Sequence, residues 1–557
     1  MANNIISKNI SFEFEENPIN IKNILSHISE EELSSGGKQT IIIRTPRAVS
    51  DPAVLSKIFS TESAENGLIF SFTDEAGKFK ADLYLTSTPD GICFKIHAEA
   101  PEPIWLLEWK LTGLNFEEVI VPALGGQSLT NEMPDETTLS YKYPFWWNAQ
   151  FVIGKTKNGG LLLRSKDSAP ILKLLRVGKS GNTFSISFGV EAAAPLSSKQ
   201  LEAEWFVDCF EGDWKNAVEA HRTWLESAFD LKTYNKHPHF PDWANDINFI
   251  LEIWGARKNI EGANHTFAQM IQRLYDFKEL HNPENTLVYL PGFAENGVDS
   301  HAPDYNPSEQ CGGEIEFKRL VDTAHSLGYK IMIHTNVLAL TFTHRLYPEF
   351  KKHQVIDAFE RPQGWAMDID GDWLAEPYFA YMNPGAKEWG DLMENIIGEL
   401  ITKFNLDGVF LDQTLLAFNV SNGPNFLEGM RGHIKRLQGA FPKILFAGEG
   451  LHEHVLEALP LAQIHGIDSI TEVHGMEGQQ PWKKAHSVSV CLFGKYTRFT
   501  AHLLTKHPSN PIFDFQESVY EQLGVIPALC LYNHKQEMDT PKVRKMIERA
   551  KKIKSRK

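Results

Sequence analysis

The chain has 557 residues, of which 42% are hydrophobic and 23% are charged, and its formal net charge is −16. This length predicts two or three domains rather than one, and the composition is typical of a folded, water-soluble protein. The acidic charge argues against a nucleic-acid partner, because such a protein needs Lys and Arg to neutralise phosphates. We therefore expect an enzyme that acts on a neutral or polar substrate.

The five cysteines are scattered through the chain without a CxxC pair. This spacing predicts neither a disulfide framework nor a zinc site. The first residues, MANNIISKNISFEFEENP, contain no apolar signal core, and no apolar run has the length of a membrane span. We therefore expect a cytoplasmic protein without a membrane partner, a metal or another cofactor.

Residues 1–235 are predicted to form an antiparallel β-sandwich domain. Between residues 67 and 100, apolar and polar side chains alternate, and the sequences DEAG and PDG supply turns between the runs. Residues 200–210 continue the alternation, and many strands without intervening helices are typical of a sandwich. An amphipathic helix is expected near residues 213–229, and the proline-containing stretch 233–243 is interpreted as the linker to the next domain.

From residue 243 to residue 557, short apolar strands alternate with amphipathic helices. About eight such units have the size and rhythm of a (β/α)8 TIM barrel. A doubly wound open sheet is the alternative, but no glycine-rich phosphate-binding motif follows a strand. Helices are expected at 266–280, 314–328, 383–404, 425–441 and from His452 onward. Strands are expected at 247–255, 285–293, 329–340, 408–412, 443–450, 467–473, 496–504 and 525–532.

Two carboxylates end neighbouring strands of this predicted barrel. Asp412 is the last residue of GVFLD, which we count as the fourth strand, and Glu449 ends the fifth strand in KILFAGEG. In a TIM barrel, catalytic residues lie at the carboxyl ends of the strands. Since neighbouring strands lie about 4.8 Å apart, the two carboxyl groups are expected at about 5 Å, the separation found in retaining glycosidases. Each could instead be an ordinary strand-end carboxylate that faces solvent.

Other polar and aromatic side chains fall at the same predicted barrel mouth. Neutral His and Asn side chains can donate to and accept from sugar hydroxyls, and aromatic rings can stack on sugar faces. Structural hydrogen bonding and loop packing are the alternative roles for such residues. The candidates for substrate binding are Trp254, Asp304, His334, Asn336, Trp373, Gln413, Glu472, His474 and His502.

Three short motifs occur in an order that resembles the α-amylase superfamily: EFKRLVDTAHSLGYKIMIHTNVLAL, LDGVFLD and ILFAGEG. With a large β-sandwich before the barrel, the whole layout more closely resembles the α-retaining glycosidases of the endo-α-N-acetylgalactosaminidase type. This resemblance implies that Asp412 is the nucleophile and that Glu449 is the acid/base. It also implies an oligosaccharide or other α-linked glycoside as the substrate.

Two other functions stay open from the sequence. The first is a metal-dependent barrel hydrolase or lyase that uses Asp412, Glu449, His334 and His474. The second is a non-catalytic carbohydrate-binding protein, because a fold alone does not establish activity. The residues specify neither the sugar and its linkage nor endo or exo action.

Overall fold

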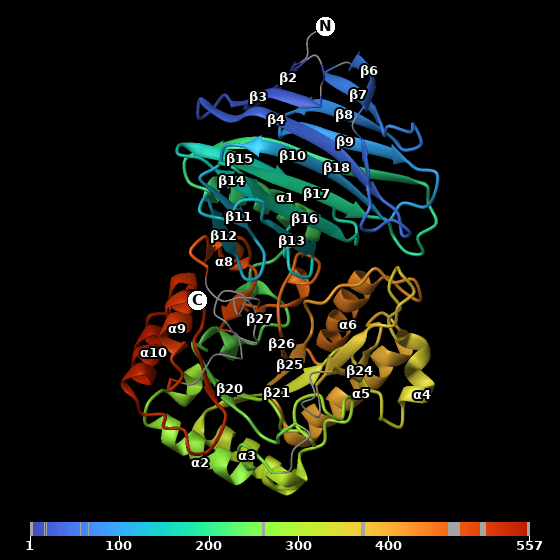
Figure 1. Ribbon diagram of the computed structural model, residues 1–557. Helices are drawn as coiled ribbons and strands as arrows, with labels where there is room; N and C mark the ends of the chain where they lie inside the picture. Colours follow the sequence, from blue (N-terminus) through green and yellow to red (C-terminus); the bar gives the residue numbers. More distant parts are fainter. Residues whose placement is uncertain are drawn as a thin grey trace. The chain divides into compact units, whose positions relative to one another are not determined.

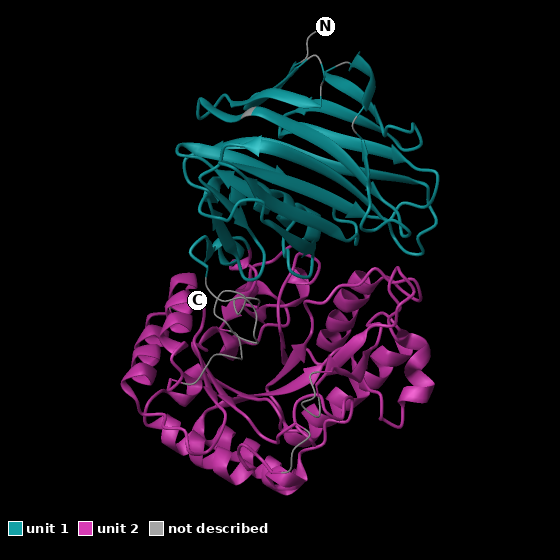
Figure 2. Ribbon diagram, in the orientation of Figure 1, with its two compact units in different colours: residues 1–230, 474–492 teal, residues 231–473, 493–557 magenta. Residues whose placement is uncertain are grey.

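The computed structural model describes residues 4–15, 17, 19–55, 57–64, 66–258, 262–368, 374–465, 480–501 and 508–553. The chain forms two compact units (Figure 1 and Figure 2). The first unit comprises Met1–Asp230 and His474–Leu492, and the second comprises Leu231–Val473 and Phe493–Lys557. Within the described part of the chain, no helix combines the length and the apolar character needed to cross a membrane.

The first unit consists of two antiparallel sheets and the helix α1 (Lys215–Phe229), which follows the strand β18 (Gln200–Glu211). The strands are β1 (Asn4–Ile6), β2 (Ile10–Phe14), β3 (Asn20–Ser26), β4 (Glu31–Arg44), β5 (Ala53–Leu55), β6 (Lys57–Ala64), β7 (Gly67–Thr73), β8 (Lys80–Thr88), β9 (Gly91–Glu99), β10 (Leu106–Leu114), β11 (Glu118–Val121), β12 (Gln127–Thr130), β13 (Thr138–Tyr143), β14 (Phe151–Lys155), β15 (Gly159–Arg164), β16 (Lys173–Ser180), β17 (Thr183–Glu191), β18 (Gln200–Glu211) and β28 (Lys483–Ala485). One sheet has the order β1-β2-β3-β4-β10-β17-β16-β13, with β5 paired to β4. The other has the order β28-β12-β11-β14-β15-β18-β9-β8-β7-β6.

The alternation of apolar and polar residues explains how these sheets pack. In β8, the side chains of Ala81, Leu83 and Leu85 are buried, whereas the residues between them are less buried or exposed. The rings of Trp109 on β10 and Phe94 on β9 lie 4.4 Å apart between centroids, so residues of both sheets share one hydrophobic core. This arrangement fits the predicted antiparallel sandwich.

The second unit is built around eight parallel strands. In chain order they are β19 (Phe249–Ile253), β20 (Thr286–Leu290), β21 (Lys330–Asn336), β25 (Gly408–Asp412), β26 (Leu445–Gly448), β27 (Leu461–Gln463), β29 (Arg498–Thr500) and β30 (Ala528–Leu531). From β19 to β29 each strand pairs with the next, and β30 pairs with β19, so β29 and β30 are the two ends of the sheet. Thr500 of β29 forms a parallel bridge with Ile526, and the Ala501 N–H donates to the Ile526 carbonyl at 2.8 Å. The sheet is therefore a nearly closed barrel, which fits the predicted TIM barrel.

Helices lie outside the parallel strands in Figure 1. They are α2 (Phe267–Lys278), α3 (Gly313–Leu327), α4 (Tyr347–Phe350), α5 (Lys387–Phe404), α6 (Phe426–Ala440), α9 (Phe513–Leu523) and α10 (Pro541–Lys552), and α8 (Val488–Phe493) follows β28. Short 3-10 helices occur at η1 (Tyr234–Lys236), η2 (Asp242–Asn245), η3 (Pro283–Asn285), η4 (Glu309–Cys311), η5 (Lys351–His353) and η6 (Leu456–Ala458). A three-stranded antiparallel sheet, β22 (Ala339–Thr341), β24 (Glu376–Tyr381) and β23 (Gly364–Met367), is inserted after β21.

Two predicted elements differ from the structure. The helix expected from His452 is only the short η6, because residues 451–456 are all buried, including the polar residues 452–454, and provide no exposed face for a surface helix. The sixth barrel strand is β27, which pairs with β26 and lies before the predicted strand 467–473. That predicted strand falls outside the described residues.

Candidate active site

The fourth and fifth barrel strands bring Asp412 and Glu449 together. In β25, Gly408 to Leu411 are buried and Asp412 is the first partly exposed residue. Leu411 pairs with Gly448 of β26, so Glu449 follows at the same level. The backbone of Gln413 has φ of 62°, and its N–H donates to Oε2 of Glu449 at 2.8 Å. The turn after the strand therefore links the two carboxylate positions directly.

The side chain of Asn336 connects Asp412 to a second carboxylate. Its Nδ2 donates to Oδ2 of Asp412 at 3.1 Å and to Oδ2 of Asp299 at 3.0 Å. Asn336 ends β21 and pairs with Asp412 of β25 in the parallel register, which places its amide beside the strand-end carboxylate. Asp299 lies in the loop after β20, in a left-handed backbone conformation with φ of 56°.

A histidine and a tyrosine support Asp299 from the barrel interior. Nε2 of His334 lies 3.0 Å from Oδ1 of Asp299, and the Tyr289 hydroxyl lies 2.6 Å from Nδ1 of the same ring. Because an ionised carboxylate only accepts hydrogen bonds, the ring must present its Nε2 proton to Asp299. The three side chains are buried, so this hydrogen-bonded row is shielded from solvent.

Several charges act on Asp412. Burial, and then the nearby charges of Glu449 and Asp299, raise the pKa of Asp412 well above its usual range, while Lys258 opposes this shift. Burial lowers the pKa of Lys258, and the attraction of Asp299 and Asp412 partly offsets it. Two close carboxyl groups do not both ionise readily, so this cluster holds a proton at a pH where isolated carboxylates have none.

Asp299 has the opposite shift. Although burial alone would raise its pKa, His334, Lys258 and the Asn336 amide together hold the pKa of Asp299 below its usual range. Asp299 therefore ionises more readily than Asp412 within this cluster.

Three of these groups lie close enough to be considered as metal ligands. Asp299, His334 and Asp412 each offer an atom within 4.8 Å of the others. A metal ligand must present a lone pair, whereas Nε2 of His334 presents a proton to Asp299, and the Asn336 amide lies between the two carboxylates. In this arrangement the three form a hydrogen-bonded row and not a ligand set.

The other described candidates lie at the ends of barrel strands or in loops. The Trp254 indole N–H donates to Oε1 of Glu252 at 2.5 Å, and its ring stacks on Tyr532 with 5.6 Å between centroids. Oδ2 of Asp304 lies 3.0 Å from Nε2 of His344. Nε2 of Gln413 donates to the Tyr381 hydroxyl at 3.3 Å. Trp373, Glu472, His474 and His502 lie outside the described residues.

Sequence reasoning missed several members of the cluster. Lys258 follows Arg257 after the first barrel strand, and nothing in the sequence distinguishes it from a surface cation. Nε2 of His465 lies 3.1 Å from Oε1 of Glu449, but His465 follows β27, whereas the sixth strand is expected only at residues 467–473. Tyr289 lies within an apolar strand, where nothing in the sequence separates it from a core residue. Asp299 was not missed in the same way, because the sequence places it with Glu295 and Asp304 in a loop at the barrel mouth, and the loop conformation then selects Asp299.

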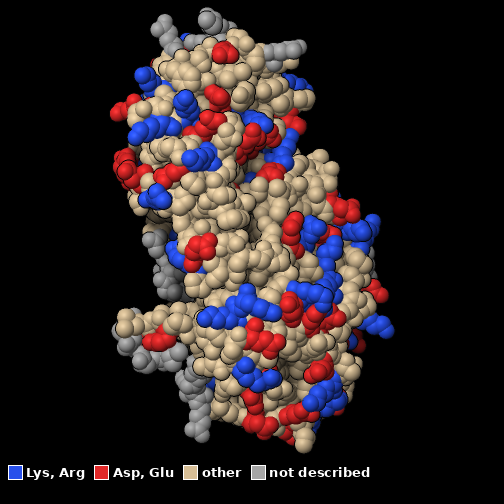
Figure 3. Space-filling model, turned by 90° about the vertical axis from the view of Figure 1, so that its right-hand side faces the viewer, with Lys and Arg blue, Asp and Glu red and all other residues tan. Residues whose placement is uncertain are grey.

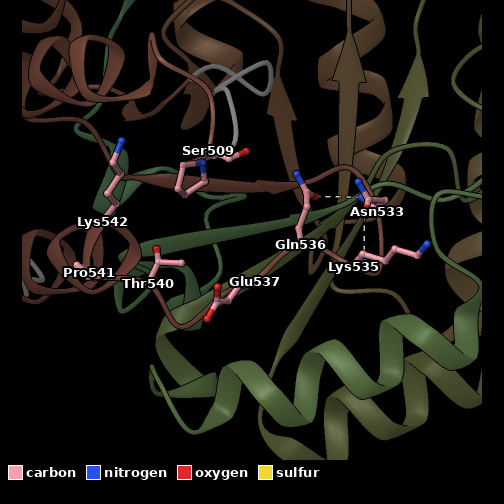
Figure 4. Close-up of a pocket in the computed structure, with 9 residues that line it drawn as sticks. Ser509, Asn533, Lys535, Gln536, Glu537, Thr540, Pro541 and Lys542 are labelled. Carbon is pink, nitrogen blue, oxygen red and sulfur yellow. Dashed lines mark hydrogen bonds between the residues drawn. The ribbon is translucent and has the colours of Figure 1, made fainter.

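The surface of the protein offers less evidence for a ligand site than the carboxylate cluster does. Acidic and basic side chains are interspersed on the face shown in Figure 3. A hollow of about 660 Å³ lies among the residues around the loop after β30 and the start of α10 (Figure 4). Its described lining includes Ser509, Asn533, Gln536 and Lys542, but neither Asp412 nor Glu449. The carboxylate cluster is therefore the stronger candidate for chemistry.

A family described as a domain of unknown function, DUF6259, matches residues 200–424, which is less than half of the chain. No curated protein matches the sequence.

Among solved structures, the ligand-free alpha-N-acetylgalactosaminidase from Bifidobacterium bifidum is similar with a TM-score of 0.74 at 12% identity, over 98% of this chain and 93% of that chain. Its GalNAc complex gives a TM-score of 0.70 at 11% identity, over 93% and 92% of the two chains. A GH36 alpha-galactosidase from Geobacillus stearothermophilus gives 0.48 at 10% identity, over 97% and 76%. The likeness to the Bifidobacterium enzyme shows that the two chains share a fold over nearly their whole length.

Proposed function

We propose that this protein is a retaining hydrolase of α-linked glycosides, with Asp412 as the nucleophile and Glu449 as the acid/base. The observation that carries the proposal is the pair of carboxyl groups at the ends of adjacent parallel strands, joined through the Gln413 N–H. Such a pair on rigid elements is what double displacement at a sugar carbon requires. The solved structure with a TM-score of 0.74 is titled an alpha-N-acetylgalactosaminidase, which supports α-glycosides as the substrate class.

The reaction has two steps. Asp412 attacks the anomeric carbon and forms an ester with the sugar, while Glu449 gives its proton to the departing glycosidic oxygen. Glu449, now ionised, then removes a proton from water, which attacks the same carbon and releases Asp412 as the carboxylate. Oδ2 of Asp412 is held by Asn336, so we assign the attack to Oδ1.

The two-step reaction needs one proton on the carboxyl pair before the sugar binds. The cluster supplies this condition, because the close carboxyl groups disfavour ionisation of both. Lys258 and the Asn336 amide favour the anion at Asp412. We therefore propose that Asp412 reacts as the anion when a glycoside fills the site, although burial, Glu449 and Asp299 raise its pKa in the free protein.

Substrate contacts are proposed for the remaining candidates. Oε1 of Gln413 is buried and has no hydrogen-bond partner among the described residues, so it can accept from a sugar hydroxyl. The Trp254 N–H is already engaged by Glu252 and one face of its ring stacks on Tyr532, so we propose that the other face contacts a sugar. The same role is proposed for Asp304, Trp373, Glu472, His474 and His502.

The first test replaces the nucleophile. Asp412→Asn should reduce hydrolysis of aryl α-glycosides by several orders of magnitude, as expected when a nucleophile is removed, while the protein stays folded. A fluorinated or cyclitol-type inactivator should label Asp412 in the wild type. Asp391→Asn, on the outer helix α5, is the matched control and should keep full activity. A label on another carboxylate would refute the assignment.

The second test separates acid catalysis from nucleophilic attack. Glu449→Ala should lose most activity on natural glycosides but less on substrates with good leaving groups, which need no proton. Azide should restore part of the turnover, because it can attack the glycosyl ester without a general base. Equal losses on both substrate types, without rescue, would contradict the role of Glu449.

The alternatives give different outcomes in the same experiments. Sugar binding without cleavage of any aryl α-glycoside would identify a carbohydrate-binding protein. Stoichiometric metal in the purified protein, with activity abolished by a chelator and restored by that metal, would identify a metal-dependent hydrolase.

A further inference from the structure

The amide of Asn336 has a fixed orientation. Its Oδ1 accepts from the backbone N–H of Leu338 at 2.9 Å and of Ala339 at 3.0 Å. Because backbone N–H groups only donate, the oxygen must face them, and Nδ2 must face the carboxylates. Both Nδ2 hydrogens are then used, one by Asp299 and one by Asp412.

Burial separates Asn336 from direct contact with a ligand. Its exposure is 0%, whereas Asp412 beside it is partly exposed. The Asn336 backbone N–H also donates to the Tyr305 hydroxyl at 2.8 Å. The side-chain amide and the backbone N–H of this residue are therefore engaged by the protein, which favours a positioning role over direct contact with a substrate.

Asp299 holds the other side of the amide. It receives Asn336 at Oδ2 and the Nε2 proton of His334 at Oδ1, and His334 is held in turn by Tyr289. The row Tyr289–His334–Asp299–Asn336–Asp412 thus runs from the barrel interior to the strand-end carboxylate. A charged acceptor strengthens a hydrogen bond, so Asp299 holds the amide in the position that serves Asp412.

We propose that Asn336, braced by Asp299, is a positioning residue that fixes the carboxylate of Asp412 in one orientation for attack on the sugar. This role rests on the proposed function of Asp412. The amide holds Oδ2 of Asp412, leaves Oδ1 for bond formation and stabilises the anion with a hydrogen bond. The titratable groups that face Asp412 from the surrounding elements are Lys258, Tyr289, Asp299, Tyr305, His334, Tyr381 and Glu449.

Asn336→Asp tests the proposal, because it keeps the oxygen that accepts from Leu338 and Ala339 but removes the donor to Asp412. We expect kcat on aryl α-glycosides to fall at least about 10-fold, the effect of losing one hydrogen bond to a charged group. KM should stay within about 3-fold, since the residue does not touch the substrate. The acid limb of kcat/KM should move to higher pH, because the nucleophile ionises less readily.

Asp299→Asn should move the acid limb of the kcat/KM profile in the opposite direction, to lower pH. It removes a negative charge that disfavours the Asp412 anion. The new amide can donate to His334, whose neutral ring can present Nε2 as an acceptor when its proton moves to Nδ1. The acid limb should therefore shift to lower pH, a readout that loss of folding alone would not produce.

The exchange variant, Asn336→Asp with Asp299→Asn, decides between positioning and net charge. It keeps the total charge and the side-chain volumes of the pair, but it removes the donor at residue 336, whose orientation Leu338 and Ala339 fix. We expect kcat to stay low and the acid limb to stay displaced. Recovery of the wild-type profile in this variant would overturn the proposal, as would an Asn336→Asp variant with the wild-type rate and pH profile.

Thr335→Val is the matched control on the same strand. Thr335 is also fully buried and donates to the Phe410 carbonyl at 3.0 Å, away from the carboxylates, so its loss should leave kcat and the pH profile unchanged. Labelling with the inactivator distinguishes a failure of the proposed function from a failure of the positioning role. A label on a residue other than Asp412 refutes the proposed function, whereas a label on Asp412 with a normal Asn336→Asp profile refutes only the positioning role.

Discussion

At the level of single residues, we expect the carboxyl group of Asp412 to lower the free energy of unfolding as pH rises. Its pKa in the fold lies well above the ordinary value of 3.8, first because of burial and then because of Glu449 and Asp299. Below the ordinary value, both folded and unfolded chains hold the proton. Above it, the unfolded chain releases the proton first, so stability falls with rising pH, by at most about 1.4 kcal/mol per pH unit, until the folded-state pKa is passed.

Asp412→Asn should remove this loss. We expect the difference in Tm, variant minus wild type, to be near zero at about pH 4 and positive at about pH 8. Thermal unfolding followed by circular dichroism across this range measures it. Asp391→Asn is the control with the opposite sign, because hydrogen bonds from Lys387 and Arg436 lower the pKa of that exposed carboxylate. A difference for Asp412→Asn that does not grow with pH would contradict the raised pKa.

Individual site residues differ in how far the sequence could predict them. The sequence predicts Asp412 and Glu449 as site residues by position, because each lies at the end of a short apolar strand and function in a barrel lies at that place. Asn336 was placed at the same mouth, but its engagement by Leu338, Ala339 and Asp299 depends on loop geometry that no periodicity encodes. Side chains in loops are therefore where sequence reasoning is weakest.

At the level of elements, two glycines of α6 have contrasting surroundings. A Cβ on Gly429 would lie 2.5 Å from the backbone nitrogen of Gly385 and 2.7 Å from its Cα, which cannot move away as a side chain can. A Cβ on Gly432 would meet nothing within 4 Å. The first glycine is thus required by the close approach of α6 to the turn before α5, and the second is not.

Substituting both glycines tests this packing. Gly429→Ala should destabilise the protein by roughly 1–3 kcal/mol, as overpacking does. Gly432→Ala should stabilise it by roughly 0.5–1 kcal/mol, because Ala has the higher helix propensity. Urea unfolding of the two variants gives both free-energy changes. A stabilising effect of Gly429→Ala would show that the two segments can separate at little cost.

The predicted helices match the structure where the period of the apolar residues agrees with their burial. In α5, the periodic spacing of eight apolar residues predicts one buried face. Five of them are buried (Trp389, Met393, Ile397, Leu400 and Phe404), and the other three are partly buried (Leu392, Ile396 and Ile401). The segment after β26 lacks such a pattern, because consecutive residues from 451 to 456 are buried, and the helix expected there is only η6. A short, fully buried run cannot be assigned by periodicity alone.

At the level of the whole molecule, the chain returns to its first unit late in the sequence. Residues 474–492 belong to the unit formed by residues 1–230, and β28 extends its second sheet beside β12. The Thr130 N–H donates to the Trp482 carbonyl and the His486 N–H to the Gly126 carbonyl, at 2.9 Å in both cases. A sequence pattern cannot predict this pairing. A strand of three residues is too short to indicate its partner, and the segments before and after it in the sequence read as strands and helices of the barrel.

A proline at Lys484 should therefore weaken the first unit, although it lies within the part of the sequence that otherwise builds the barrel. Lys484 pairs with Ser128 in the middle of β28, and its side chain is exposed. Proline removes the backbone donor and fixes φ, so Lys484→Pro should disrupt the ladder, whereas Lys484→Ala should leave it intact. Hydrogen exchange should become faster in β12 for the proline variant only, with β25 in the barrel unchanged. Faster exchange in β25 rather than β12 would assign this segment to the second unit instead.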